Sequence, residues 1–168
     1  MSETKDLLST EAIAKIKQMA TDIKTCMFFT ELGVRPIPTR PMGVQEVDDQ
    51  GNLWFLSSKS SNKNVEIGHD NEVQLVFASN ADVHYLSVFG TAVIYTDRSH
   101  VEDIWSPIAK AWFEEGVNDP EATVIKVTPK HAYYWDTKYG KLVSLFKIAV
   151  GAITGNTDEA SVEGRLKV

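Results

Sequence analysis

The chain of 168 residues contains only one cysteine, no long apolar run and no cluster of basic residues. One cysteine cannot build a thiolate metal site. Cys26 lies in an apolar run, where burial would keep its thiol protonated and slow to react. No run approaches the roughly 20 apolar residues of a membrane-spanning helix, and the polar residues 1–5 lack the apolar region of a signal peptide. We therefore expect a cytoplasmic protein with a buried thiol and no membrane partner.

The charge pattern and the missing motifs exclude several functions. The formal net charge is -6 and the lysines and arginines are scattered, so nucleic acid is not an expected partner. The four histidines are dispersed without HxxxH or CxxC spacing, and we assign no metal site. The chain lacks GxSxG, Walker and GxGxxG motifs, so hydrolase and nucleoside-triphosphatase functions have no support. An anionic ligand would need a local basic pocket.

The hydrophobic patterns predict a mainly β protein with helices, in the α+β class. Apolar residues at helical spacing predict a first helix that Ser9 or Thr10 caps and that covers one opening of a barrel or sheet. The length suits a single domain spanning residues 1–168. Short polar turns between the strand-like runs suit hairpins and antiparallel neighbours. These predicted strands are residues 25–30, 39–47, 53–57, 72–79, 83–96, 122–128 and 132–135.

A second helix is predicted over residues 99–115. Ser99 and Glu102 have the spacing of a capping box, and Pro107 should divide the helix into two pieces. An aromatic stripe on one face favours core packing over cofactor contact. Its members are Trp105, Ile108, Trp112 and Phe113.

Two further segments have distinct patterns. Gly90 interrupts the apolar run 84–95, which indicates either a β-bulge or a tolerated glycine. Residues 142–153 are apolar and fit a strand or a helix. Residues 154–164 are polar, and we expect them to be mobile.

A phosphate site is one interpretation of the segment around residues 39–63. Arg40 lies on one predicted strand, Ser57 ends the next, and Ser61, Asn62 and Lys63 form the turn that follows. If that turn opens a helix, backbone N–H groups and the helix dipole would join the side chains in holding a phosphate. The alternative is that residues 57–64 form a solvated loop, as clusters of Ser, Asn and Lys usually do.

The order of motifs along the chain resembles the general stress protein 26 family. These are small relatives of pyridoxamine 5'-phosphate oxidase with an FMN-binding split β-barrel. The resemblance covers about residues 5–140 as the core and leaves 141–168 as a C-terminal extension. The motifs that carry it are Arg40-Pro41-Met42, Leu53-Trp54-Phe55-Leu56-Ser57, Ser61-x-Lys63, Tyr85-Leu86-Ser87-Val88-x-Gly90, Ala111-Trp112-Phe113-x-x-Gly116-x-x-Asp119-Pro120 and Tyr134-Trp135-Asp136.

The resemblance implies a six-stranded antiparallel split β-barrel with flanking helices, which forms a homodimer with FMN at the interface. By that resemblance Arg40, Ser61, Asn62 and Lys63 would contact the flavin phosphate. The isoalloxazine would lie along Pro41, Met42 and Gly43 and meet Leu56 and Ser57. Trp135 would come from the partner subunit. The expected function is an FMN-dependent oxidoreductase of unknown substrate, or a non-catalytic protein that binds flavin or another phosphorylated ligand in a stress response. A small-barrel interaction protein without a cofactor is a third possibility.

Several departures from the oxidase pattern argue against genuine pyridoxamine 5'-phosphate oxidase activity. Asn62 stands where the oxidase has an arginine, and Gln45 where it has a lysine. Tyr85 replaces a flavin-contacting glutamine. Lys141 follows Trp135 where the oxidase has an arginine, and a lysine does not reproduce its bidentate fork. We assign no catalytic side chain.

Overall fold

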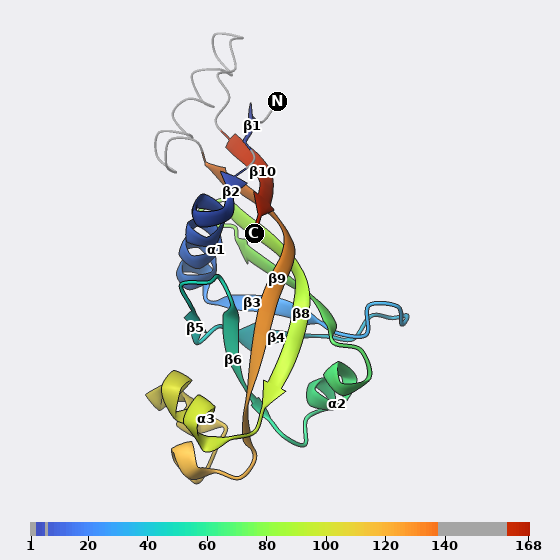
Figure 1. Ribbon diagram of the computed structural model, residues 1–168, viewed down its shortest axis with the longest axis vertical. Coiled ribbons are helices and arrows are strands. Elements are labelled where there is room, and N and C mark those ends of the chain that lie inside the picture. Colours follow the sequence, from blue (N-terminus) through green and yellow to red (C-terminus); the bar gives the residue numbers. More distant parts are fainter. Residues whose placement is uncertain (1–2, 6, 138–160) are drawn as a thin grey trace.

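The computed structural model describes residues 3–5, 7–137 and 161–168 (Figure 1). The segment 142–153, which fits a strand or a helix by its sequence, and Lys141 lie outside the described residues. The helices are α1 (Ser9–Ile23), α2 (Asn62–His69) and α3 (Arg98–Ile104), with short 3-10 turns at Pro107–Ala111 and Gly116–Asn118. The strands are β1 (Glu3–Thr4), β2 (Leu7–Leu8), β3 (Thr25–Phe29), β4 (Thr39–Gly43), β5 (Glu46–Val47), β6 (Leu53–Ser58), β7 (Glu72–Ser79), β8 (His84–Tyr95), β9 (Ala122–Thr137) and β10 (Ser161–Lys167).

These strands form one large, mostly antiparallel sheet of ten strands. Six of them pair antiparallel in the order β6, β9, β8, β7, β3, β4. The sheet is larger than the predicted six strands because β1, β2, β5 and β10 add to it. Of these, β1 and β2 pair with β10 in the parallel direction.

The two ends of the six-stranded series, β4 and β6, contact one another. Within the part of the chain that the structure describes, they form no paired ladder with each other. The second edge of β4 and the Phe55–Ser58 part of β6 therefore carry backbone groups that no neighbouring strand pairs. Such an edge is open to a ligand or to another chain.

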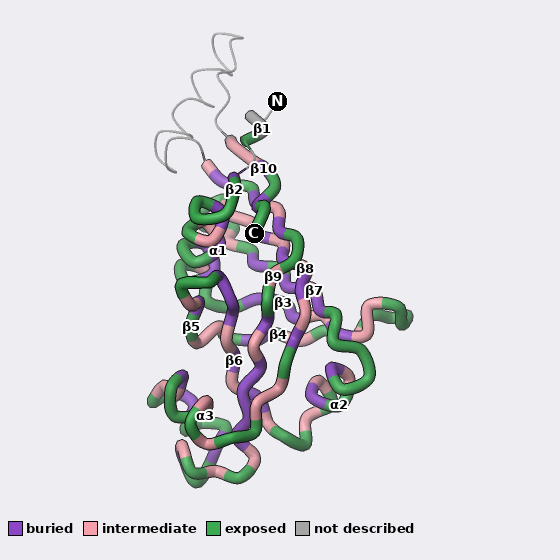
Figure 2. Tube along the Cα trace, viewed as in Figure 1, coloured by how far each residue is buried: buried purple, intermediate pink, exposed green. Residues whose placement is uncertain are grey.

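The sequence explains most of the strands by alternation. Val73, Leu75 and Phe77 are buried on β7, with more exposed residues between them, as a half-buried strand requires. Figure 2 shows that buried positions also recur along β6, β8 and β9. In the core the rings of Phe28 and Phe55 meet edge to face, with their centroids 5.3 Å apart.

β9 is one long strand, whereas the sequence predicts two. The predicted break at residues 129–131 is a bulge, where the pairing of β8 with β9 shifts register between Phe89 and Gly90. This confirms the bulge at Gly90. A Cβ atom at Gly90 would lie 2.3 Å from the backbone oxygen of Thr128, so only glycine allows this approach.

Helix α1 covers the sheet beside β5, β7, β8 and β10 (Figure 1). It buries Ala12, Ile16, Met19 and Ala20, which recur at helical spacing. It begins at Ser9, so the prediction that Ser9 or Thr10 caps it was wrong. No side chain caps it, because Leu8 occupies the N-cap position.

The predicted division of the second helix at Pro107 is confirmed, whereas its predicted capping box and part of its aromatic stripe were wrong. Asp97 caps α3, and its carboxylate accepts hydrogen bonds from the Ser99 hydroxyl and the His100 N–H. A charged acceptor two positions earlier thus replaces the predicted capping box. The helix ends before Pro107, and a 3-10 turn follows it. Because a 3-10 turn has a different period from an α-helix, the residues of the predicted stripe do not all lie on one face. Phe113 is buried, whereas Ile108 and Trp112 are 69% and 72% exposed.

Part of the segment predicted to be mobile is a strand. β10 pairs antiparallel with the C-terminal half of β9 and buries Leu166. Backbone pairing and one buried leucine outweigh the polar composition of residues 161–164. Residues 154–160 lie outside the described part.

Cys26 lies in the core at 1% exposure, and burial raises the pKa of its thiol to about 12. Because only the thiolate is nucleophilic, we expect a thiol reagent such as DTNB to label Cys26 at least about 100-fold more slowly in the native protein than in denaturant. Stopped-flow absorbance measures both rates. Fast labelling of the native state would contradict the buried placement.

Candidate functional site

The N-terminus of α2 is the centre of the candidate site. The helix begins directly after the turn that follows β6, as the phosphate-site interpretation requires. Ser61 is the N-cap residue in an extended conformation, and its side chain caps no N–H group. The N–H groups of Asn62 and Lys63 have no acceptor among the described residues. Free N–H groups and the helix dipole make this end attractive to an anion.

A buried polar network fixes this helix to the sheet. The Ser57 hydroxyl donates to Asn64 Oδ1 at 2.6 Å, and Asn64 Nδ2 donates to Thr123 Oγ1 at 2.9 Å. Thr123 Oγ1 in turn donates to the Ser57 carbonyl at 2.8 Å. The network joins α2, β6 and β9, so it holds the helix N-terminus at one position relative to the sheet.

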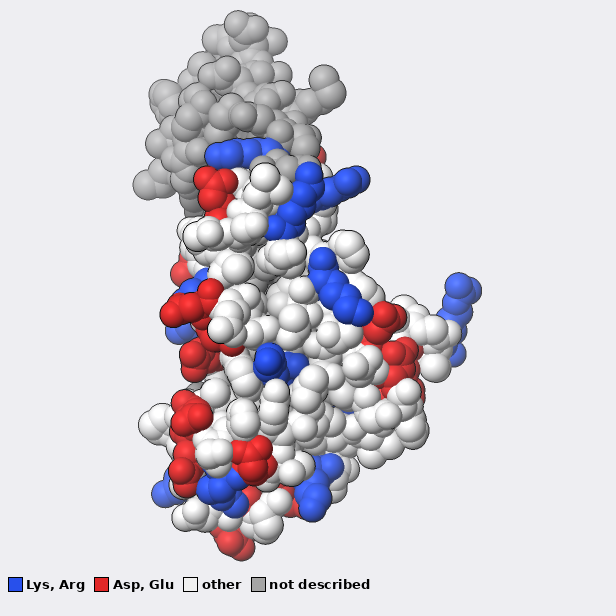
Figure 3. Space-filling model, viewed as in Figure 1, with Lys and Arg blue, Asp and Glu red and all other residues white. Residues whose placement is uncertain are grey.

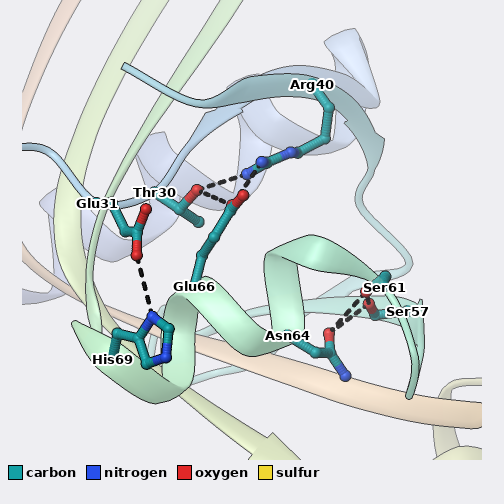
Figure 4. Close-up of polar contacts among 8 residues, drawn as sticks. All are labelled: Thr30, Glu31, Arg40, Ser57, Ser61, Asn64, Glu66 and His69. Atoms are coloured by element: carbon teal, nitrogen blue, oxygen red, sulfur yellow. Dashed lines mark hydrogen bonds and ion pairs between the residues drawn. The ribbon is translucent and has the colours of Figure 1, made fainter. Parts of the chain in front are cut away.

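Arg40 reaches from β4 to α2, as Figure 4 shows. Its guanidinium donates to Thr30 Oγ1 at 2.6 Å and to Glu66 Oε2 at 2.5 Å. The Thr30 hydroxyl donates to the same Glu66 oxygen at 2.5 Å. Three of the five guanidinium N–H groups are left for other acceptors. One turn further along α2, His69 Nδ1 lies 3.2 Å from Glu31 Oε1, so the end of β3 is held to this helix at two points.

Lys63 is the half-buried cation of the site. Within the described ranges, no carboxylate lies at ion-pair distance from its ammonium group. Burial lowers the pKa of Lys63, and the charge of Arg40 lowers it further, while Glu66 opposes this shift. A half-buried ammonium beside a guanidinium, with no carboxylate of its own, favours an anionic ligand.

The other predicted residues surround this point on β4 and β6. Pro41 and Gly43 are exposed on the edge strand, and Leu56 is half-buried on β6. Met42 points into the core at 9% exposure, so only its backbone can face a ligand at that edge. Asn62 is exposed in the first turn of α2.

Trp135 does not join these residues within one chain. It lies twelve residues along β9 from Thr123, the partner of Ser57 in the sheet. It packs against Tyr133 at a ring distance of 4.7 Å and is 40% exposed.

Comparison with known proteins identifies the family. The model of the "Pyridoxamine 5'-phosphate oxidase like" family matches residues 11–159. The chain belongs to this family. Its structural neighbours are general stress protein 26 proteins, which agrees with the resemblance in the motifs.

Three relatives illustrate the similarity to this family. A protein assigned to general stress protein 26 from Jannaschia sp. CCS1 has a TM-score of 0.79 and 23% identity, covering 95% of this chain and 99% of that one. The general stress FMN/FAD binding protein from Xanthomonas citri has a TM-score of 0.65 and 27% identity, covering 75% and 89%. Protein bli-3 of Neurospora crassa is 29% identical over 126 residues, or 70% of this chain. The match spans only 60% of the length of bli-3.

Four residues of this site are not predicted from the sequence: Thr30, Asn64, Glu66 and Thr123. Glu66 follows Lys63 by three residues, which on a helix places both on neighbouring positions of one face. That spacing was a usable signal once α2 was expected. Asn64 and Thr123 carry no such signal, because only the folded sheet brings them together.

The described residues show no metal centre. Across residues 3–5, 7–137 and 161–168, no group of three or more His, Cys, Asp or Glu side chains is placed to hold a metal ion. No helix in the same ranges is long and apolar enough to cross a membrane.

Proposed function

We propose that the protein is an FMN-binding flavoprotein, and that Lys63 and Arg40 hold the flavin phosphate at the N-terminus of α2. The observation that carries the proposal is the half-buried Lys63, which lies beside Arg40 and has no carboxylate partner among the described residues. The site fits a phosphate because it offers two cations, free backbone N–H groups and a helix dipole. The Xanthomonas citri relative, described as FMN/FAD binding, supports the same ligand class.

The open edges of β4 and β6 are where we place the isoalloxazine ring. In this proposal the six antiparallel strands form the split barrel, and the ring lies along the backbone of Pro41–Gly43 and meets Leu56 and Ser57. Unpaired strand edges offer hydrogen-bond donors and acceptors to the polar edge of a flavin. The Ser57 hydroxyl already donates to Asn64, so it can only accept from a ligand.

We further propose a homodimer in which the partner subunit brings its Trp135 to this site. Within one chain Trp135 is too far along β9 to reach it. Three apolar side chains are exposed on β3, β7 and β9: Met27 (41%), Val76 (37%) and Trp135 (40%). Met27 and Val76 are direct neighbours across two strands. An exposed apolar face of a sheet favours burial against a second copy.

A bound FMN would supply hydride or electron transfer, while the protein positions it and excludes water. Among the described residues, the carboxylate of Glu66 at this site is engaged by Arg40 and Thr30, so it is not available as a general base. This observation keeps a non-catalytic flavin carrier as the second candidate. We place the protein, in either role, in the cytoplasm.

The test is an absorption spectrum of the purified protein after loading with excess FMN and desalting. We expect flavin peaks at a stoichiometry of about one per chain, together with a dimeric mass by light scattering. Oxidation of reduced pyridine nucleotide would then separate an oxidoreductase from a carrier. Colourless protein with an intact dimer would refute the flavoprotein proposal.

The charge pattern on the surface indicates whether nucleic acid could be a partner. On the face shown in Figure 3, acidic side chains gather over the α1 and α3 side, and the basic side chains are scattered. A nucleic-acid surface would need massed positive charge instead. With the net charge of -6, this argues against nucleic acid as a partner in the proposed function.

A further inference from the structure

Glu66 puts a negative charge inside a site proposed to bind an anion. Its carboxylate side chain is 17% exposed and is held by Arg40 and Thr30 through the same oxygen atom (Figure 4). It lies one helical turn after Lys63 on α2, so it is close to both cations of the site.

Glu66 is ionised in this arrangement. Burial alone would raise its pKa, but hydrogen bonds from Thr30 and Arg40, together with the charges of Arg40 and Lys63, hold the pKa below its ordinary value of 4.5. The three side chains Arg40, Lys63 and Glu66 therefore carry a net charge of about +1 at neutral pH. Without the carboxylate the same site would carry about +2.

The effect of this difference in site charge on affinity depends on the charge of the ligand. A phosphomonoester has a second pKa of about 6, so it is mostly a dianion at pH 7.5 and mostly a monoanion at pH 5. A site with a net charge near +1 neutralises a monoanion and leaves one charge of a dianion uncompensated. Repulsion between that charge and Glu66 acts at short range in a half-buried site, where solvent screens it only partly.

Resting on the proposed function, we infer that Glu66 is the specificity-determining residue for phosphate charge: it lowers the affinity for a dianionic flavin phosphate more than the affinity for a phosphate that carries one negative charge. Arg40 keeps its position through Thr30 and Glu66, and the charge of Glu66 limits how strongly it can attract phosphate.

The experiment compares the wild type with E66Q in the full-length protein. Glutamine keeps a side-chain oxygen that can accept from Arg40 and Thr30, but it removes the charge. Dissociation constants for FMN are measured by fluorescence quenching at pH 7.5 and pH 5.0, and riboflavin, which has no phosphate, is titrated in parallel. Thermal melts verify that each variant is folded.

We expect E66Q to bind FMN about tenfold more tightly than the wild type at pH 7.5, and less than about threefold more tightly at pH 5.0. Riboflavin affinity should change by less than about twofold. The control T30V removes the hydroxyl that bridges Arg40 and Glu66 without changing charge, and it should show no gain at either pH.

Each contrary outcome has a definite meaning. Weaker FMN binding by E66Q would overturn the inference, because Glu66 would then act by positioning Arg40. An equal gain at both pH values would also overturn it, because the effect would then not depend on the charge of the phosphate. Equal FMN affinity of both proteins would overturn the inference and leave the proposed function standing. If neither the wild type nor E66Q binds FMN at all, both the proposed function and the inference about Glu66 fail.

Discussion

Replacing Lys63 by methionine is expected to weaken FMN binding by about 10- to 150-fold. Methionine keeps most of the apolar length of the side chain and removes the charge together with its hydrogen-bond donors. A charge-assisted hydrogen bond contributes roughly 1.5 to 3 kcal/mol, which corresponds to this range of affinity. Lys63 has no carboxylate partner among the described residues, so its full charge is available to the phosphate. For the same reason, the substitution leaves no carboxylate unpaired, and the loss of affinity reports on the ligand alone. Titration of FMN fluorescence against K63M and wild-type protein measures the effect.

Lys59 provides the matched control for Lys63. It lies four residues earlier in the same polar stretch, but its side chain is exposed and it precedes α2. K59M should retain FMN within about twofold of the wild type. An equal loss in K59M and K63M would show that general surface charge, and not a site at α2, attracts the flavin.

Replacing Gly90 by alanine is expected to lower the free energy of unfolding by about 2 to 3 kcal/mol, the range of serious overpacking. The added methyl would lie 2.3 Å from the Thr128 oxygen and 3.0 Å from its carbonyl carbon, and both contacts are to backbone. Thr128 cannot easily move away, because it is paired with Thr91 of β8. Urea unfolding at a fixed protein concentration measures the change.

The control for Gly90 is Gly33, around which an added Cβ meets nothing within 4 Å. G33A should change the free energy of unfolding by less than about 0.5 kcal/mol. If G90A is as stable as G33A, the bulge can relax, and the close approach to β9 is not what requires glycine there.

Some strands of the sheet can be predicted from local sequence patterns and others cannot. β7 was predicted at its observed bounds, since its alternation is strict and polar residues flank it. The sequence predicts two strands, 122–128 and 132–135, in place of β9, but the bulge accommodates Pro129 within one continuous strand. β10 was missed because its composition is polar, and its stability comes from pairing with β9, a partner remote in sequence. Local patterns cannot report such a partner.

The residues of the candidate site also fall into those that the sequence predicts and those that it does not. Arg40 and Lys63 could be chosen from the sequence because phosphate requires positive charge, and the fold does bring both to α2. The negative member, Glu66, was overlooked because an exposed helical carboxylate is the ordinary expectation. The network beneath α2 could not be predicted, since Asn64 belongs to a stretch that looks solvated until Thr123 is placed against it.

The parallel ribbon of β1, β2 and β10 has a consequence for the order in which the chain folds. It pairs Glu3 with Val162 and Leu7 with Leu166, so nearly the whole chain forms the intervening loop. Contacts of such long separation carry the largest closure entropy and form late. The antiparallel hairpins can form first from neighbouring segments, and the ribbon then fastens both ends of the polypeptide to the completed sheet. For the same reason, among the described strands this ribbon should be the first to exchange its amide hydrogens.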